Sequence, residues 1–189
     1  MKHNRNRGFT LIELLVGLAI LSVLALLAVT AFDGSRSKAQ AMIGLIKQVG
    51  DANIMLKNDT GCYVTRPDAL FNADAAATAS YNYCGRAFGK SWSRPYLGRQ
   101  EVNASNGNIR AEKIGSGVEV SLQRENGGLG RIYFVRAENV PNDILRQALI
   151  ECVGDDEANV SFPTNKCRAS LGSGTSEVGT FDMIYDETR

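Results

Sequence analysis

A carboxylate lies inside the most apolar part of this chain, close to its start. Residues 9–32 carry one charged side chain, Glu13, and they follow a basic segment that contains Lys2, Arg5 and Arg7. At about 1.5 Å per residue, a helix over this range is longer than the roughly 20 residues that cross the hydrocarbon core of a bilayer. Because a carboxylate buried there is costly unless it is paired, Glu13 is a candidate functional residue.

Two ordinary interpretations of this region are open. A secretory signal peptide fits the basic start and the small residues 29–31, but the apolar run is longer than a usual h-region and contains an acid. A plain N-terminal membrane anchor fits the length, and the preceding positive charge predicts a cytoplasmic N-terminus with the rest of the chain exported. Neither interpretation accounts for Glu13.

The stretch from Gly8 to Val16 reads Gly-Phe-Thr-Leu-Ile-Glu-Leu-Leu-Val. It resembles the N-terminal signature of type IV pilins and the related type II secretion pseudopilins. The resemblance implies that a prepilin peptidase cleaves between Gly8 and Phe9, and that the new N-terminal Phe9 is then N-methylated. It also implies that Glu13 forms a charge pair with Phe9 of a neighbouring subunit, which sets the stagger between subunits during assembly.

The chemistry of these residues agrees with that role. The amine of Phe9 stays cationic at neutral pH after one methylation. Phe9 and Glu13 are i and i+4 neighbours on a helix, so the carboxylate can meet the amine of its own chain or that of an adjoining subunit. The residues alone leave both partners open.

The resemblance also implies a fold and an organisation. We expect an α+β pilin fold, in which a long N-terminal helical spine packs on a C-terminal globular domain with an antiparallel β-sheet. The expected parts are a removed leader (1–8), a transmembrane or filament-core half of the helix (9–32), an amphipathic half (33–58) and a globular head (59–189).

The amphipathic half is supported by its own periodicity. Apolar residues recur at helical spacing, at Met42, Leu45, Ile46, Val49, Ala52, Met55 and Leu56. Turn-forming residues 58–61 close the helix.

The sequence that follows this helix predicts a loop-rich segment and then a sheet. Residues 66–115 show little regular pattern apart from a short helix over 73–79. Alternating strands are expected over 117–122 and 131–135, joined by a hairpin at Asn126-Gly127-Gly128. A helix over 142–152 should stop at Gly154, and a last strand should cover 181–185.

The chain has four cysteines, an even number that fits an oxidising compartment outside the cytoplasm. Four cysteines permit three pairings. We predict the local one, Cys62 with Cys84 and Cys152 with Cys167, the second of which resembles the disulfide-bounded C-terminal region of pilins. The cysteine spacing argues against a zinc site, and no metal is predicted.

Two further clusters have ordinary and functional interpretations. Residues 81–96 interleave aromatic and basic side chains, which suits packing or a filament interface first, and adhesion or DNA contact second. The residues are Tyr81, Tyr83, Arg86, Phe88, Lys90, Trp92, Arg94 and Tyr96. The acidic groups Asp155–Glu157 and Asp182, Asp186 and Glu187 fit a solvated surface better than a calcium site.

Composition narrows the function. The chain has 21 basic and 20 acidic residues, so nucleic acid is not indicated as a partner. The only histidine lies in the predicted leader, which removes histidine-based catalysis from the mature chain. We predict a structural subunit, without enzymatic activity or cofactor.

The predicted subunit forms a homo-oligomeric helical filament, a type IV pilus or fimbrium used for adhesion, motility or DNA uptake. Its other partners are prepilin peptidase, the inner-membrane assembly machinery and the membrane itself. The precursor is expected in the inner membrane with its N-terminus in the cytoplasm, and the product in the extracellular pilus. A minor pilin or type II secretion pseudopilin, and a membrane-anchored periplasmic binding module or enzyme, are the alternatives.

Overall fold

The computed structural model describes residues 11–127, 130–155, 162, 165–174 and 177–188, with all side chains in these ranges except those of 25–33. The chain divides into two compact units, residues 1–35 and 36–189, which are described separately. Helix α1 (Leu11–Thr60) contributes its first part to one unit and its second part to the other. With five antiparallel strands after this helix, the chain has the predicted α+β fold.

Helix α1 ends close to the predicted boundary. The hydroxyl of Thr60 donates to the carbonyl of Leu56 at 2.8 Å, and the amide of Gly61 donates to the carbonyl of Lys57 at 2.6 Å. Gly61 has φ +81°, a conformation that a residue with a side chain adopts only at a cost. The glycine therefore terminates the helix.

The second part of α1 is amphipathic and packs on the sheet. Its buried apolar side chains recur every three or four residues, at Ala39, Met42, Ile46, Val49, Ala52 and Leu56. Met55 was expected on the same stripe, but it is 52% exposed. The buried face continues through Asn53 and Leu56 instead, which turns Met55 toward solvent.

The sheet has the order β1-β2-β3-β5-β4, with every neighbouring pair antiparallel. Its strands are β1 (Ile109–Arg110), β2 (Glu119–Gly127), β3 (Gly130–Pro141), β4 (Cys167–Ser170) and β5 (Val178–Thr188). Strands β2 and β3 form the predicted hairpin, in which Gly127 pairs with Gly130. The long strands extend beyond their predicted ends, and β1 and β4 were not predicted.

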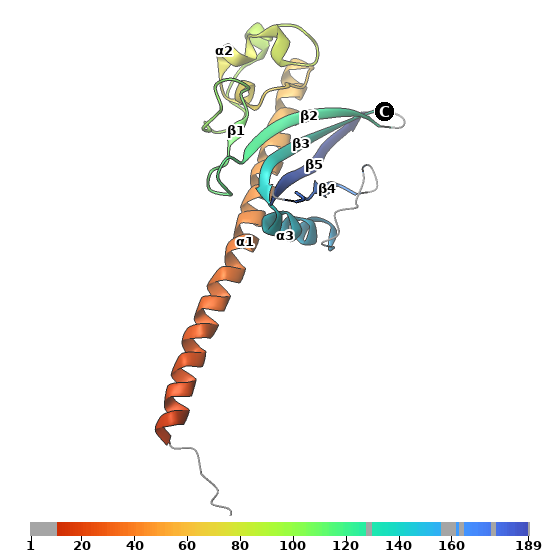
Figure 1. Cartoon of the computed structure of the whole chain (residues 1–189). Helices are drawn as coiled ribbons and strands as arrows, with labels where there is room; N and C mark the ends of the chain where they lie inside the picture. The colour runs from red at the N-terminus through yellow and green to blue at the C-terminus, as the bar shows by residue number, and fades with distance from the viewer. Residues whose placement is uncertain (1–10, 128–129, 156–161, 163–164, 175–176, 189) are drawn as a thin grey trace, which may run out of the picture. The chain divides into compact units, whose positions relative to one another are not determined.

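Helix α3 (Asn142–Val153) follows β3 and confirms the predicted helix and its stop. Gly154 has φ +83° and its amide donates to the carbonyl of Ile150. The buried face of α3 presents Ile144, Leu145, Ala148 and Leu149 to the core. In Figure 1 this helix lies at one end of the sheet, next to the end of β3.

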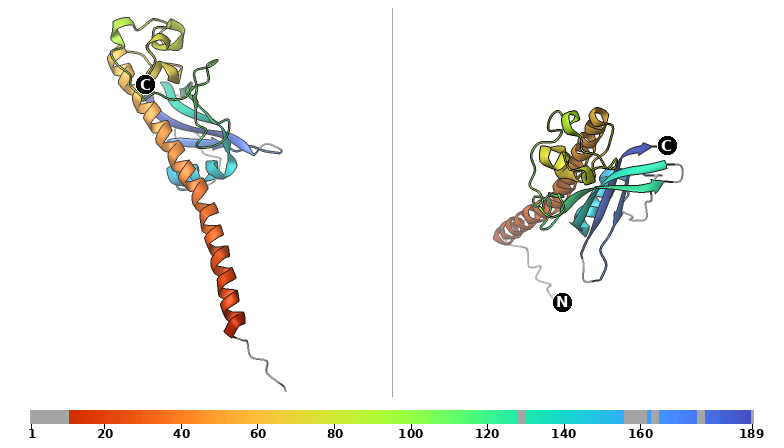
Figure 2. Two further views of the ribbon diagram at one scale, coloured as in Figure 1. Left: turned by 90° about the vertical axis from the view of Figure 1, so that its left-hand side faces the viewer. Right: turned by 90° about the horizontal axis from the view of Figure 1, so that it is seen from above.

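The segment between α1 and β1 is loop-rich, as expected. It contains η1 (Pro67–Leu70), α2 (Ala73–Ala76), η2 (Ala79–Tyr81) and η3 (Gly89–Ser91). Figure 2 shows this segment gathered around the C-terminal end of α1. Helix α2 is shorter than the predicted 73–79.

Candidate assembly segment and the head that follows it

Glu13 lies in the first turn of α1 as the structure describes it. A helix N-terminus carries a partial positive charge, which favours a carboxylate near it. Gly8 and Phe9, the predicted cleavage and methylation residues, lie outside the described residues. The pairing of Glu13 with Phe9 therefore stays a prediction.

The helical segment around Glu13 exposes a large apolar surface. Ten large apolar side chains between Leu11 and Leu24 are 55–79% exposed. A continuous apolar surface of this kind marks a site of association. Within the described part of the chain, no helix is both long enough and apolar enough to cross a membrane. The transmembrane assignment of residues 9–32 stays a prediction.

In the head, Asn53 joins the long helix to the segment that leaves it. Its Nδ2 donates to the hydroxyl of Tyr185 at 2.8 Å and, over 3.4 Å, to the carbonyl of Val64. Its Oδ1 accepts from the amide of Val64 at 3.0 Å. Val64 also forms a β-bridge with Asn82, so this short extended segment is held on both sides.

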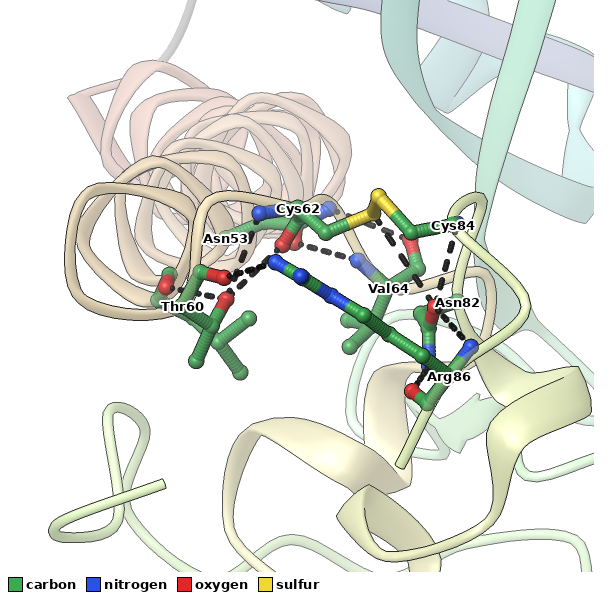
Figure 3. Close-up of a disulfide and its surroundings, with 8 residues drawn as sticks. Asn53, Thr60, Cys62, Val64, Asn82, Cys84 and Arg86 are labelled. Carbon is green, nitrogen blue, oxygen red and sulfur yellow. Dashed lines mark hydrogen bonds between the residues drawn. A yellow bond between two sulfur atoms is a disulfide. The ribbon is translucent and has the colours of Figure 1, made fainter. Parts of the chain in front are cut away.

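The disulfide between Cys62 and Cys84 lies beside this contact (Figure 3). Around it, the guanidinium of Arg86 donates to the carbonyl of Thr60 at 2.9 Å, which satisfies an acceptor at the end of α1. Asn82 accepts from the amide of Cys84 at 3.0 Å and donates to the carbonyl of Arg86 at 2.7 Å. The disulfide is one member of the local pairing expected from the sequence.

The second disulfide joins Cys152, in the last turn of α3, to Cys167, the first residue of β4. It completes the local pairing. The same end of α3 contacts α1 through Glu151, whose carboxylate accepts from Arg36 at 2.9 Å and from Gln40 at 3.3 Å. The disulfide and these polar contacts therefore hold the last turn of α3 from two sides.

Four tyrosines cluster where β3 and β5 meet the segment that follows α1. They are Tyr63, Tyr83, Tyr133 and Tyr185. The ring of Tyr133 lies 4.4 Å from that of Tyr63, 5.8 Å from that of Tyr83 and 6.3 Å from that of Tyr185. Burial, together with a short hydrogen bond from the Tyr63 hydroxyl to the carboxylate of Asp186, raises the pKa of Tyr63. Burial also raises the pKa of Tyr185 well above its usual value. Tyr63 and Tyr185 therefore stay protonated at physiological pH, and the four rings pack against one another.

The aromatic and basic segment 81–96 is largely committed to contacts within the head. Phe88 is buried, the indole of Trp92 donates to the carbonyl of Ala69 at 3.1 Å, and the hydroxyl of Tyr96 donates to Asp59 at 2.8 Å. These contacts tie Phe88, Trp92 and Tyr96 to neighbouring parts of the head. The geometry fits the packing interpretation, with Lys90 and Arg94 left exposed.

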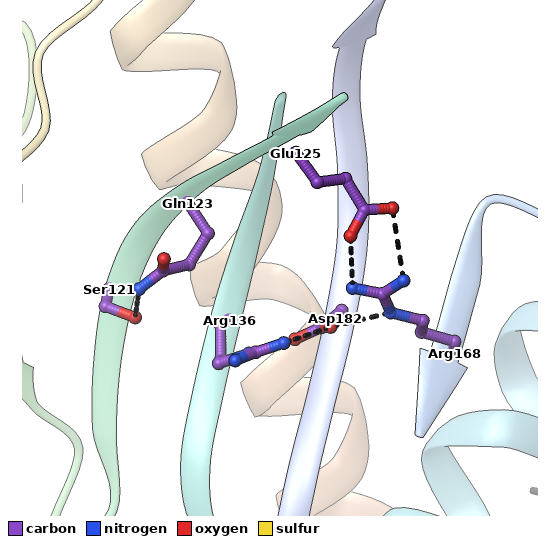
Figure 4. A network of polar contacts seen from close by, with 6 residues as sticks. All are labelled: Ser121, Gln123, Glu125, Arg136, Arg168 and Asp182. Atoms are coloured by element: carbon purple, nitrogen blue, oxygen red, sulfur yellow. Dashed lines mark hydrogen bonds and ion pairs between the residues drawn. The ribbon is translucent and has the colours of Figure 1, made fainter. Parts of the chain in front are cut away.

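Asp182 belongs to an ion-pair network on the sheet (Figure 4). Its carboxylate accepts from Arg136 on β3 at 2.7 Å and from Arg168 on β4 at 2.8 Å. Arg168 also binds Glu125 on β2 at 2.9 Å. The side chain of Asp182 is 3% exposed, so the expectation of a solvated acid was wrong for this residue. Two arginines compensate the cost of its burial.

Two sequence comparisons place the chain among known proteins. A family model described as the prokaryotic N-terminal methylation motif matches residues 3–29. The type II secretion system core protein G of Aeromonas hydrophila is 34% identical over 106 residues, which cover 51% of this chain and 74% of that protein. The chain belongs to the type IV pilin-like family. No solved structure matches this pilin-like chain significantly.

The pilin-like head has contacts that sequence reasoning missed. Strand β4 has only four residues, and its pairing with β5 is the reason that Arg168 reaches Asp182. The position of Cys167 in the predicted disulfide was the signal that a structured segment lies there.

Among the residues that the structure describes, no three cysteine, histidine or acidic side chains gather in a way that could hold a metal ion. Asp155 is described, whereas the other two residues of the acidic run 155–157 lie outside the described residues. In the second acidic group, Asp186 accepts from Tyr63 and lies 3.5 Å from the amine of Lys57.

Proposed function

We propose that this protein is a structural subunit of a type IV pilus, assembled as many copies into a helical filament. The observation that carries the proposal is Glu13, a carboxylate in the first turn of a helix whose large apolar side chains from Leu11 to Leu24 are exposed. Residues 1–8 are a leader that prepilin peptidase removes, and Phe9 becomes the methylated N-terminus. The carboxylate of Glu13 then pairs with the amine of Phe9 on an adjoining subunit.

The exposed apolar side chains have two successive environments in this proposal. In the precursor, residues 9–32 lie in the inner membrane with the N-terminus in the cytoplasm. In the filament, the same surface packs against other copies, because apolar side chains that leave lipid must be buried again. The head, residues 59–189, is exported and forms the outside of the filament. We propose a structural role for it, without catalysis.

The second candidate is the core subunit of a type II secretion pseudopilus. One observation favours it, the 34% identity to the core protein G of that system in Aeromonas hydrophila. The two candidates share processing and assembly, and they differ in where the filament is found. A pilus subunit is abundant in the filaments sheared from the cell surface. If the chain is instead a pseudopilin, deletion of its gene should stop type II secretion.

Mass spectrometry of the sheared filament fraction tests the proposal. The expected N-terminal tryptic peptide begins at Phe9, ends at Arg36 and carries one additional methyl group. A mature protein that begins after Ala31 would indicate a signal peptide. A protein that keeps Met1 would indicate a plain anchor. Either finding refutes the proposal.

Replacement of Glu13 tests the assembly contact. In Glu13→Ala the amine of Phe9 is buried without a partner, at a cost of about 3 kcal/mol or more, so filament yield should fall by more than about a hundredfold. Ser22→Ala is the matched control, because the Ser22 hydroxyl donates to the carbonyl of Ala19 on its own helix at 2.8 Å. Leader cleavage should be normal in both variants, and normal filaments from Glu13→Ala would contradict the proposed role.

A further inference from the structure

The loop between the bridge partners Val102 and Ile109 contains the sequence Asn103-Ala104-Ser105. An Asn-x-Ser or Asn-x-Thr pattern is the acceptor for N-linked glycosylation in surface loops of exported proteins. The chain contains this pattern at three places, residues 58–60, 103–105 and 159–161, and the last lies outside the described residues. Because the pattern alone is common, the contacts of each asparagine side chain must show whether it could be glycosylated.

The side chain of Asn103 is held in an arrangement that suits an asparagine to which a glycan is attached. Its Oδ1 accepts from the amide of Ser105 at 3.1 Å and from the hydroxyl of Ser105 at 2.7 Å. Its Nδ2 donates one hydrogen to the carboxylate of Glu119 at 2.7 Å. A carboxamide nitrogen carries two hydrogens, so the second can be replaced while the contact with Glu119 is kept. Ala104 and Ser105 are exposed.

The hydroxyl of Ser105 explains why the third residue of the pattern matters chemically. An amide nitrogen is a weak nucleophile, because its lone pair is delocalised onto the oxygen. When the nitrogen loses a proton, negative charge gathers on Oδ1, and the two hydrogen bonds from Ser105 stabilise that charge. The arrangement at Asn103 therefore favours reaction at Nδ2.

The first match, at Asn58, lacks this geometry. Asn58 lies within α1, and the hydroxyl of Thr60 donates to the carbonyl of Leu56 at 2.8 Å instead of to the Asn58 side chain. Thr60 is 6% exposed. A rigid helix that buries the hydroxyl cannot present the pattern to an enzyme. Asn58 is thus an internal control.

We propose that Asn103 is an N-linked glycosylation site of the exported head, an inference that rests on the proposed export. The donor is an oligosaccharide linked through a diphosphate to a lipid. A bond forms between Nδ2 and the anomeric carbon, and the bond from that carbon to the diphosphate oxygen breaks with its electron pair. The displaced proton passes to a base of the transferring enzyme. The glycan stands next to the segment that bridges to β1, at one edge of the sheet.

The test is peptide mapping of the protein purified from the envelope of its native host. Trypsin cleaves after Arg99 and Arg110, so one peptide contains the whole pattern at 103–105. This peptide should carry a sugar mass that fragment ions place on Asn103, whereas the peptide with Asn58 should be unmodified. Ser105→Ala should lose the sugar mass from Asn103, and Ser105→Thr should keep it.

The proposal is overturned if the wild-type peptide is found mainly unmodified, if the sugar occurs on Asn58 or Asn159 alone, or if Ser105→Ala still carries it on Asn103. The same digest reports the N-terminal peptide that begins at methylated Phe9. Its presence shows that the molecule was processed, so failure of the glycosylation proposal is distinguishable from failure of the proposed function.

Discussion

Asn53 should be one of the most sensitive polar positions in the head. It is fully buried on α1 and holds both the segment after the helix and the hydroxyl of Tyr185 on β5. Asn53→Ala removes all of these contacts in a single change. The amide of Val64 and the hydroxyl of Tyr185 then have no partner at this position, and both lie inside the protein.

The size of the effect follows from those two groups. A buried donor or acceptor without a partner costs about 1–3 kcal/mol. The 3.4 Å contact with the carbonyl of Val64 is too long to add much. We therefore expect Asn53→Ala to lower the free energy of unfolding by about 3 kcal/mol. With a urea dependence of about 2 kcal/mol per molar, the midpoint should fall by about 1.5 M.

Urea unfolding of the detergent-solubilised chain, followed by the fluorescence of Trp92, measures this loss in the head. Trp92 is the only tryptophan. Two variants complete the design. Asn53→Leu fills the space but leaves the same groups without partners, so it should lose as much as Asn53→Ala. Asn58→Ala changes an exposed asparagine of the same helix and should stay within about 0.5 kcal/mol of wild type.

The outcomes separate the explanations. If Asn53→Leu restores most of the stability, the loss in Asn53→Ala comes from the cavity and not from the hydrogen bonds. If Asn53→Ala behaves like Asn58→Ala, the reasoning is refuted altogether.

Two further predictions use the same assay. A Cβ at Gly50 would lie 2.7 Å from the Cβ of Tyr185, so Gly50→Ala should lower the free energy of unfolding by about 1–3 kcal/mol. A Cβ at Gly44 would have nothing within 4 Å, so Gly44→Ala should raise the free energy of unfolding by about 0.5–1 kcal/mol. Equal effects of the two substitutions would contradict the close approach of α1 to β5. Hydrogen bonds from asparagine side chains, mainly that of Asn103, lower the pKa of Glu119 below its usual 4.5. The carboxylate therefore contributes fully to the free energy of unfolding above pH 4.5, and this contribution is lost as the pH falls through the pKa of the folded state. The free energy of unfolding should therefore fall from about pH 5 to about pH 3 by more in wild type than in Glu119→Gln, and an unchanged pH dependence in that variant would count against the assignment.

The elements that were predictable have strong local signals. Helix α1 has a long periodic pattern without proline, and its end is marked by Gly61. The β2–β3 hairpin follows from Asn126-Gly127-Gly128, because glycine permits the backbone of a tight turn. Helix α3 was predicted with its stop at Gly154. Each of these signals involves only a few neighbouring residues, so the elements that they mark can be predicted from the sequence.

The elements that were missed depend on distant partners. Strand β4 is too short to show a period and exists because it pairs with β5. Asp182 looked like a solvated acid, since nothing near it in the sequence reveals Arg136 and Arg168. Met55 has the spacing of a buried residue, and only the position of the sheet shows that its side faces solvent.

The sequence by itself determined the candidate assembly site and most of the secondary structure. Glu13 is recognisable because a charge in an apolar run is costly wherever the run packs, and because the predicted leader and Phe9 precede it by a few residues. The tertiary structure decided the rest, because hydrogen bonds and ion pairs between distant segments depend on how the chain packs. Asn53 became a structural anchor, Asp182 a buried ion-pair partner and the aromatic segment 81–96 part of the packed head only when α1, the loops and the sheet were brought together.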